Sequence, residues 1–237
     1  MKILSVITGI GYGHSIRQAA LLNYLKNEEV TIAGYSNSLE YFKNKFETIE
    51  ILGPKFPESS YKLKILKTIF LNLLLPFYYL KNYFQLRRTI KVFQPNLIIT
   101  DFEPLPLYMS KNIPHILMFN FDPGFYKGFI KENKKYKLQK KYIDIVYNRA
   151  KKIQAPIIIP SLLGERPSKE YAITNPITRQ LSDLTKKELI KKLNLKTSPI
   201  IISFGGSYFG TKLLHNLIDN LSEINEQFLI FSYKTIG

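Results

Sequence analysis

MKILSVITGIGYGHSIRQAALLNYL, residues 1–25, is the stretch that decides the fold. Its residues 2–8 are apolar and β-branched and predict a short buried strand. Gly9-Ile-Gly-Tyr-Gly13 interrupts that strand, and residues 14–27 repeat apolar side chains at helical spacing. A strand, a glycine turn and a helix in this order are typical of the start of a parallel α/β sheet.

The rest of the chain continues the alternation. Further strands are predicted at 30–33, 49–52, 97–100, 116–121, 155–159, 199–204 and 228–232. Helices are predicted at 39–46, 61–92 with an interruption near Pro76, 105–112, 131–152, 185–193 and 210–222. The proline-rich stretch 160–184 is expected to be a loop. The pattern predicts an α/β protein with a parallel sheet covered by helices on both faces.

The last 40 residues, 198–237, form one strand–helix–strand unit, which is too small to close a core of its own. We therefore expect a first domain over 1–184, a linking segment with a helix over 185–197, and the truncated start of a second domain over 198–237.

Composition narrows the function classes. The chain has 237 residues and no cysteine, which excludes disulfides, thiolate metal sites and a cysteine nucleophile. With only three histidines a multi-histidine metal centre is not expected, and we predict no metal.

The net charge of +16 favours anionic partners, although a lysine-rich solvated surface gives the same balance. No motif of nucleic-acid recognition accompanies the charge, so no nucleic-acid partner is expected. The start is not that of a signal peptide, and a cytoplasmic protein is expected.

The first candidate site is the glycine turn with His14. Gly9, Gly11 and Gly13 let the backbone turn tightly and approach a ligand, and helix N-terminal N–H groups favour negative charge. The spacing is not that of a dinucleotide-binding turn, and no acidic residue ends the next strand, so no nicotinamide or flavin cofactor is expected. The alternative is a structural turn with His14 as a helix cap.

The second candidate follows the strand at 97–100. Asp101 lies at the strand end where open α/β sheets place ligands, and a carboxylate there could orient and stabilise His14 as a base. Glu103 follows two residues later. In the alternative interpretation Asp101 caps the next helix and Glu103 is solvated.

The third candidate is Gly205-Gly206-Ser207, directly after the strand at 199–204. Backbone N–H groups and a hydroxyl there suit a phosphate or a reacting oxygen, although the turn lacks the lysine of a P-loop.

The apolar segment Ile69–Leu80 (IFLNLLLPFYYL) is flanked by lysines and arginines. At twelve residues it is too short to span a bilayer. The composition fits a segment lying on an anionic membrane surface; the alternative is a buried core helix. The basic run Lys131–Lys141 is a second candidate for lipid contact, or a solvated helix face.

Together these motifs resemble the GT-B glycosyltransferases, closest to the MurG-like and UDP-glucuronosyltransferase-like group. The stretch 1–25 with its glycine–histidine turn and Arg17 is similar to the opening of that group. PNLIITDFEP (95–104), YAITNPITRQ (171–180) and SPIIISFGGS (198–207) are similar to its later segments, in the same order and spacing.

The resemblance implies two Rossmann-like domains facing a cleft and a hexosyltransferase of the cell envelope. The N-terminal domain would bind a lipid-linked or polysaccharide acceptor, and the C-terminal domain a nucleotide-sugar, commonly UDP-linked, as co-substrate without a metal or other cofactor. His14 would act as base or acceptor-positioning residue, with Asp101 as its partner. Acceptor contacts would come from Gly9, Gly11, Gly13, Arg17, Glu103 and Asn120. Gly205, Gly206 and Ser207 would line the donor diphosphate.

Only the first 40 residues of the donor domain are expected in this chain. The first hypothesis is a glycosyltransferase on the inner face of the cell membrane. In a second form of this hypothesis, the chain is the acceptor-binding half and a second chain completes it. The alternative is a non-catalytic membrane adaptor or an inactive relic that needs a partner carrying the donor domain.

Overall fold

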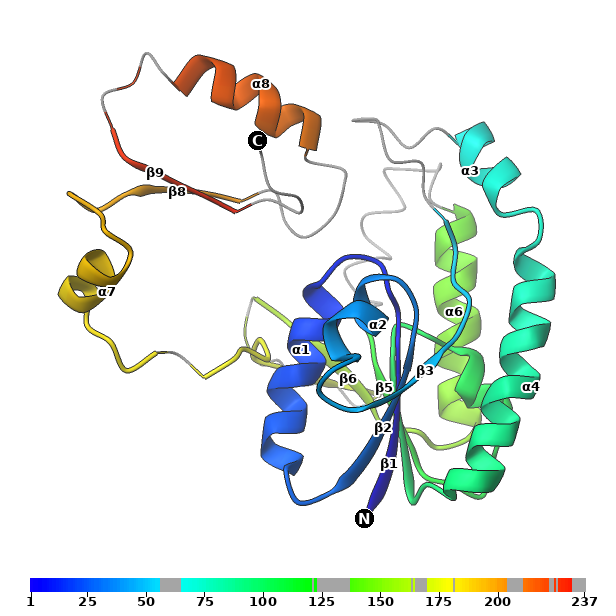
Figure 1. The fold of residues 1–237 in the computed structure, drawn as a ribbon. Helices are drawn as coiled ribbons and strands as arrows, with labels where there is room; N and C mark the ends of the chain where they lie inside the picture. The colour runs from blue at the N-terminus through cyan, green and yellow to red at the C-terminus, as the bar shows by residue number, and fades with distance from the viewer. Residues whose placement is uncertain are drawn as a thin grey trace.

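The computed structural model describes residues 1–55, 65–120, 122, 137–162, 164, 170–180, 182–203, 211–221, 224 and 226–231. Its main body is a seven-stranded sheet in the order β3-β2-β1-β4-β5-β6-β7 in which every neighbouring pair is parallel. The strands are β1 (Lys2–Ile7), β2 (Glu29–Gly34), β3 (Glu47–Glu50), β4 (Leu97–Asp101), β5 (His115–Met118), β6 (Ile157–Pro160) and β7 (Ala172–Thr174). The predicted Rossmann-like α/β fold is therefore confirmed (Figure 1).

Helices cover the two faces of the sheet as separate layers (Figure 1). Alternate residues of β1 point to opposite faces. Ile3 and Ile7 pack on the side of α1 (Gly13–Leu22) and α2 (Asn37–Phe42). Leu4 and Val6 pack on the side of α4 (Leu75–Phe93). The helical turn η1 (Asn23–Leu25) extends α1.

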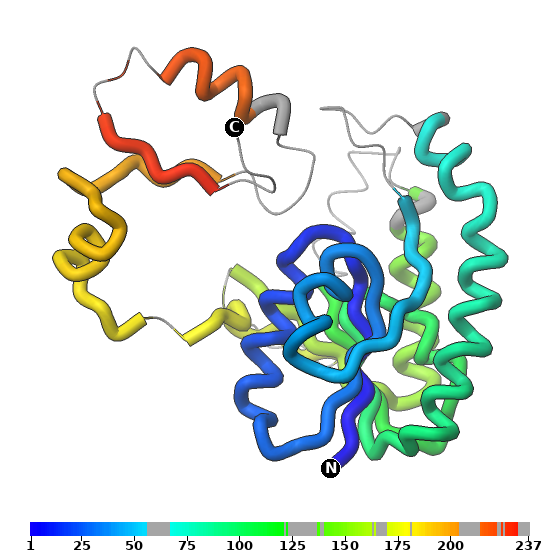
Figure 2. The backbone as a smooth tube through the Cα atoms, viewed as in Figure 1, coloured from blue at the N-terminus to red at the C-terminus, as the bar shows by residue number. Residues whose placement is uncertain are grey.

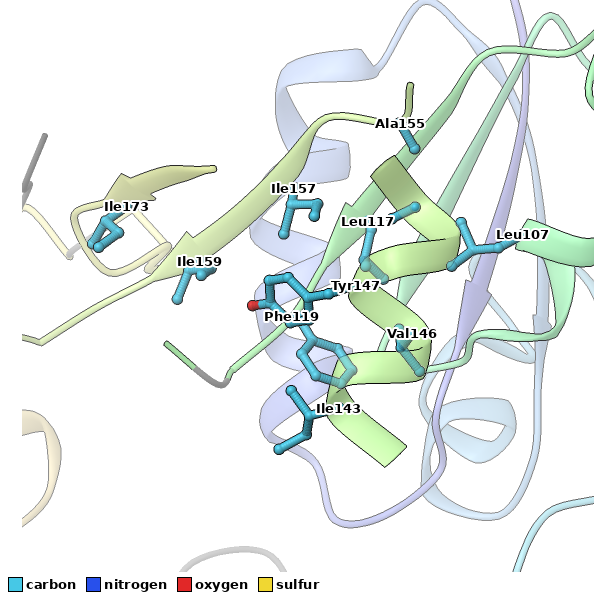
Figure 3. Close-up of a cluster of buried hydrophobic side chains, with 11 residues drawn as sticks. Leu107, Leu117, Phe119, Ile143, Val146, Tyr147, Ala155, Ile157, Ile159 and Ile173 are labelled. Atoms are coloured by element: carbon cyan, nitrogen blue, oxygen red, sulfur yellow. The ribbon is translucent and has the colours of Figure 1, made fainter. Parts of the chain in front are cut away.

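The largest core cluster lies under α6 (Lys137–Lys152) on the β5–β6 half of the sheet (Figure 3). Phe119 stacks on Phe102 with ring centroids 4.9 Å apart, and its edge meets the ring of Tyr147 from α6. This aromatic contact fixes the chain just beyond the ends of β4 and β5. The short helix η2 (Leu105–Tyr108) completes this edge and contributes Leu107 to the cluster.

The predicted long helix at 61–92 is two helices. α3 (Ile65–Leu71) ends four residues before α4, and Pro76 lies in the first turn of α4 rather than inside a continuous helix. Proline is compatible with a first turn because its missing N–H would have no partner there. Asn72 lies in the turn between the two helices; its side chain accepts from the backbone N–H of Lys55 and donates to the carbonyl oxygen of Lys55.

One expected loop contains a strand. The prediction of loop structure over 160–184 is wrong at β7, which pairs with β6 at the edge of the sheet. Three residues among prolines are too short for a period-two pattern to stand out.

Beyond β7 the chain continues through α7 (Lys186–Lys192) to a second sheet (Figure 2). There β8 (Ile200–Ser203) pairs in parallel with β9 (Phe228–Phe231), connected by α8 (Thr211–Leu221). These are the strand–helix–strand elements predicted for 198–237. Thr185 and Glu188 form a capping box at the start of α7.

Candidate active site

The carboxyl ends of β1 and β4 bring the first two candidate motifs together. The two strands are neighbours, with Ile7 in register with Asp101, and the backbone N–H of Thr8 donates to the carbonyl oxygen of Asp101 at 3.1 Å. The glycine turn after β1 and the residues after β4 therefore lie at one edge of the sheet, where open α/β folds place ligands.

His14 and Asp101 form a hydrogen-bonded pair at this edge. His14 Nδ1 lies 2.7 Å from Asp101 Oδ1. The Asp101 side chain is fully buried, whereas 13% of the His14 side chain is exposed. The ring of His14 also lies against Phe102, with ring centroids 5.4 Å apart. The imidazole is thus fixed on one side and reachable from solvent on another.

Arg17 holds the same carboxylate from the next turn of α1. Its Nε donates to Asp101 Oδ2 at 3.0 Å, its Nη2 donates to Oδ1, and its Nη1 donates to Asn120 Oδ1. The predicted residues His14, Arg17, Asp101 and Asn120 are therefore brought together, from α1, the end of β4 and the end of β5.

Gln18 belongs to the same network and was not singled out from the sequence. Its Nε2 donates to Asp101 Oδ2 at 3.0 Å and contacts Met118 Sδ at 2.9 Å, and its Oε1 accepts from Ser5 Oγ at 3.2 Å. Gln18 stands four residues after His14 and is fully buried. Its spacing of four residues from His14, which places both side chains on one face of the predicted helix, is the signal that could have revealed it.

The environment keeps Asp101 ionised. Burial alone would raise the pKa of its carboxyl, but the hydrogen bond from His14 and the charge of Arg17 outweigh burial and lower the pKa below its ordinary value. Because an ionised carboxylate only accepts, the 2.7 Å contact requires a proton on His14 Nδ1, and in the neutral ring this leaves the lone pair on Nε2. Asp101 does not cap the following helix, since Pro104 occupies the N-cap of η2.

The three glycines of the turn have different surroundings. A Cβ on Gly9 would lie 1.8 Å from the carbonyl oxygen of Tyr35, so Gly9 is required by packing. Gly11 has a φ of 69°, which glycine adopts without strain. Gly13, the first residue of α1, has nothing within 4 Å of the position of a Cβ. Gly13 therefore borders open space, unlike Gly9.

Glu103 lies apart from the His14 network. Phe102 has a φ of 58°, a left-handed conformation that interrupts the alternation of side chains along β4. Asp101 consequently meets α1, while the charge of Glu103 acts on Tyr35 and on Tyr79 of α4, on the opposite face of the sheet. The alternative of a solvated Glu103 is wrong, because only 4% of the residue is exposed.

The third candidate motif, Gly205-Gly206-Ser207, lies outside the described residues. Within the described ranges, no group of three or more His, Asp or Glu side chains could hold a metal ion.

The parallel sheet, with its candidate site at the carboxyl ends of β1 and β4, defines an α/β protein of the GT-B glycosyltransferase type. The sequence profile of glycosyl transferase family 1 matches residues 1–123, and the chain belongs to this family. No curated protein matches the chain in sequence.

Solved structures show the same fold at low sequence identity. The glycotransferase of kitacinnamycin is 12% identical with a TM-score of 0.56, and MurG of Acinetobacter baumannii is 15% identical with a TM-score of 0.51. The glycosyltransferase VinC, solved in complex with dTDP, is 12% identical with a TM-score of 0.50. These comparisons cover 100%, 98% and 98% of this chain, which spans 67%, 60% and 67% of the three proteins in the same order.

Proposed function

We propose that this protein transfers a sugar from a nucleotide-sugar to a hydroxyl group of an acceptor, with His14 as general base. The observation that carries the proposal is the 2.7 Å contact between His14 Nδ1 and the buried carboxylate of Asp101. In the neutral ring this contact places the lone pair on Nε2, for which no hydrogen bond is found among the described residues, and Nε2 would accept the proton. Membership of glycosyl transferase family 1 supports the reaction class.

In the proposed reaction, His14 Nε2 takes the proton of the acceptor hydroxyl. The hydroxyl oxygen forms a bond to the anomeric carbon of the donor, and the bond from that carbon to the diphosphate oxygen breaks. The electron pair leaves with the nucleoside diphosphate. Asp101 stabilises the imidazolium that forms, while Arg17 and Gln18 hold Asp101 in place.

The donor is proposed to be a nucleoside diphosphate sugar. UDP-sugars are the first donors to test. The dTDP bound to VinC supports a nucleoside diphosphate, and Gly205-Gly206-Ser207 are proposed to contact its diphosphate. No metal or other cofactor is part of this proposal.

The test is transfer by the purified protein with a panel of UDP- and dTDP-sugars and simple lipid and glycoside acceptors. His14→Ala should lower the rate about 10²- to 10⁴-fold while folding stays intact. His215→Ala removes another histidine, an exposed one on α8, and should leave the rate unchanged. Equal rates for His14→Ala and the wild type would contradict the role of His14. No transfer by the wild type with any donor would favour the adaptor alternative.

The acceptor is proposed to be lipid-linked, because an apolar surface covers α3 and the first half of α4. We call it the α3–α4 apolar surface. Its side chains are 55–73% exposed and comprise Ile69, Phe70, Leu73, Leu74, Phe77, Leu80 and Phe84. The alternative of a buried core helix is therefore wrong for this segment. Isolated exposed apolar residues are common, but a continuous group of this size marks an interaction site.

Helix α4 packs on the sheet through Leu86 in its second half, and its middle turns a polar side chain inward. The buried Asn82 accepts from the backbone N–H of Leu52 at 2.8 Å and donates to its carbonyl oxygen at 2.6 Å. Phe77 and Phe84 point to solvent instead. Apolar side chains on the outer face of a helix that already packs on the sheet support a partner on that outer face.

Charge indicates an anionic lipid bilayer as that partner. Residues 65–93 contain no Asp or Glu, whereas they contain five basic residues, Lys67, Lys81, Arg87, Arg88 and Lys91. All five are exposed. Each basic residue near an anionic surface contributes roughly 1 kcal/mol to binding. No helix among the described residues has the length and apolar character needed to cross a membrane. We propose peripheral docking on the inner face of the cell membrane.

Vesicle sedimentation tests the docking. The wild type should sediment with phosphatidylglycerol vesicles at low salt and less with phosphatidylcholine vesicles. Phe77→Ser combined with Phe84→Ser should abolish sedimentation, whereas Tyr24→Ser removes an exposed aromatic ring elsewhere and serves as control. Sedimentation of the double variant equal to that of the wild type would contradict docking through this surface.

A further inference from the structure

The carboxylate of Asp101 accepts four hydrogen bonds on its two oxygens. Oδ1 accepts from His14 Nδ1 at 2.7 Å and from Arg17 Nη2, and Oδ2 accepts from Arg17 Nε and Gln18 Nε2, each at 3.0 Å. A carboxylate offers about four lone-pair sites, so these donors use its whole capacity. His14 therefore shares its acidic partner with an arginine, whereas a dyad of histidine and aspartate alone would not.

Arg17 is fixed in this position and largely shielded from solvent. It stands one helical turn after His14 in α1, and its Nη1 donates to Asn120 Oδ1 beyond the end of β5. Because 11% of the Arg17 side chain is exposed, water and salt screen its charge less than that of a surface arginine. Nε, Nη1 and Nη2 each donate within the network, so Asp101 and Asn120 orient the guanidinium.

The guanidinium also lies directly beside the imidazole. Arg17 Nη2 and His14 Nδ1 are 3.1 Å apart, because both nitrogens donate to the same oxygen of Asp101. Within the described ranges, Asp101 and Arg17 are the charged side chains that come within hydrogen-bonding distance of His14. Phe102 packs against the ring and carries no charge, and Glu103 lies on the opposite face of the sheet. A proton on the imidazole thus meets one negative and one positive charge.

These two charges act on the proton of His14 in opposite directions. While the imidazole is neutral, the charges of Asp101 and Arg17 cancel. A proton on Nε2 leaves one uncompensated positive charge and places two cations side by side. Like charges at this separation disfavour each other's charged form. Arg17 therefore opposes the imidazolium that Asp101 supports.

We propose that Arg17 keeps His14 neutral, and hence ready to accept a proton, by neutralising the carboxylate that it shares with the imidazole. The inference rests on the proposed function, since it concerns the base of that reaction. It gives Arg17 an electrostatic role in addition to holding Asp101 in place. Arg17 is a positioning residue that does not touch the reacting atoms, and it sets the acid limit of the pH range in which transfer proceeds.

The direct test is nitrogen NMR of the whole chain labelled at histidine, with the His14 signals assigned through His14→Ala. The midpoint of the imidazole titration is compared between the wild type and Arg17→Gln, which keeps an amide donor and removes the charge. We expect the midpoint to rise by about 1–2 pH units in this variant. Arg17→Lys retains the charge and should keep the midpoint within about 0.5 pH unit of the wild type.

Two controls accompany the titration. Arg179→Gln removes an exposed arginine and changes the net charge equally, so it should leave the His14 midpoint unchanged. His215, which is exposed on α8, is the internal reference in every spectrum. If Arg17→Gln does not fold, Asp101→Asn is compared with the variant that carries both substitutions. The midpoint should then be about 1–2 pH units lower in Asp101→Asn, which keeps the arginine.

The pH dependence of transfer gives a second readout. On the acid side, each pH unit of midpoint shift should slow Arg17→Gln about tenfold relative to the wild type. The difference should disappear at alkaline pH, once the imidazole is neutral in both proteins. A purely structural role of Arg17 would instead slow transfer equally at every pH.

Two results of the titration would overturn the proposal. A rise of less than about 0.5 pH unit in Arg17→Gln would show that the charge of Arg17 does not act on the imidazole. An equal rise in Arg17→Lys and Arg17→Gln would show that the shape of the side chain matters and its charge does not. Because the titration needs no turnover, its outcome is independent of the proposed reaction. A raised midpoint in a protein that transfers no sugar would support the role of Arg17 and contradict the proposed function alone.

Discussion

Gln18 and Asp101 are both fully buried, and Nε2 of Gln18 donates to Oδ2 of Asp101 across 3.0 Å. The amide extends the network to Ser5 in β1 and thus ties the carboxylate to the neighbouring strand. Together with His14 and Arg17, Gln18 satisfies both oxygens of the carboxylate. This arrangement makes Asp101 a fixed partner of His14 rather than a group that exchanges protons itself.

Gln18→Met keeps the volume of the side chain and removes its polar atoms. Asp101 then loses one donor, and Ser5 loses its acceptor, so we expect a loss of about 1–3 kcal/mol in the free energy of unfolding. Urea denaturation measures it. Gln18→Glu provides the contrast, since a second carboxylate beside Asp101 should cost more at pH 7 than at pH 4. If Gln18→Met and the wild type have the same free energy of unfolding, the hydrogen bonds of Gln18 do not stabilise the protein and the prediction is wrong.

Asp101→Asn tests the electrostatics of the pair. The pKa of Asp101 is lowered on folding, so its ionisation stabilises the protein above the ordinary aspartate pKa, and that stability is lost as the pH falls from there through the lowered pKa of the folded state. The variant should lose about 3 kcal/mol at pH 7, because the largely buried charge of Arg17 keeps its contact with Asn120 but loses its anionic partner. Its stability should also change less than that of the wild type between pH 5 and pH 3, measured by denaturation at each pH. The same slope in both proteins would contradict the lowered pKa.

Glu103→Gln has the opposite pH signature. Folding raises the pKa of Glu103 from 4.5 to about 7, so the folded state keeps a proton that the unfolded chain releases. The wild type should therefore lose stability as the pH rises from 4.5 through 7. The difference of about 2.5 pH units corresponds to about 3 kcal/mol. Glu103→Gln should be more stable than the wild type at pH 8 and equally stable at pH 4. Urea denaturation of both proteins at pH 4 and pH 8 measures this difference in the free energy of unfolding. Glu50→Gln, at an exposed glutamate, is the control and should show no such pH dependence.

Gly9→Ala and Gly13→Ala separate packing from ligand approach within one turn. The first places a methyl group against the backbone and ring of Tyr35 and should destabilise the protein by about 2 kcal/mol or more. The second meets open space at the start of α1 and should be neutral or stabilising by about 0.5 kcal/mol. If a substrate approaches Gly13, transfer by Gly13→Ala should nevertheless fall. Thermal melting and the transfer assay, run on both variants, check the two effects.

Much of the fold was predictable because each apolar strand and amphipathic helix of a parallel sheet has its own local pattern. The glycine turn after β1 and the carboxylate after β4 could be placed at one edge, because parallel strands end together. Strand β7 could not be predicted, since three residues carry no periodicity and their pairing with β6 is decided by tertiary contacts.

The remaining differences have equally local causes. The sequence left Ile69–Leu80 either buried or interfacial, because hydrophobicity does not reveal which face of a helix meets the sheet. The hydrogen bonds of Asn82 to Leu52 decide that orientation. The spacing of two residues predicts that Asp101 and Glu103 lie on the same face of the sheet. The left-handed backbone of Phe102 between them places their side chains on different faces. Gln18 was missed although His14, Arg17 and Gln18 share one face of α1 at positions i, i+3 and i+4.

The backbone at Phe102 has a consequence for how such a protein can change over evolutionary time. One residue in an unusual conformation lets a single strand end direct two carboxyl groups to different surroundings, Asp101 to the His14 network and Glu103 away from it. Substitutions around Glu103 can then accumulate without touching the hydrogen bonds between His14 and Asp101. A lineage that keeps the backbone of Phe102 can vary the residues around Glu103 while the His14–Asp101 pair stays the same.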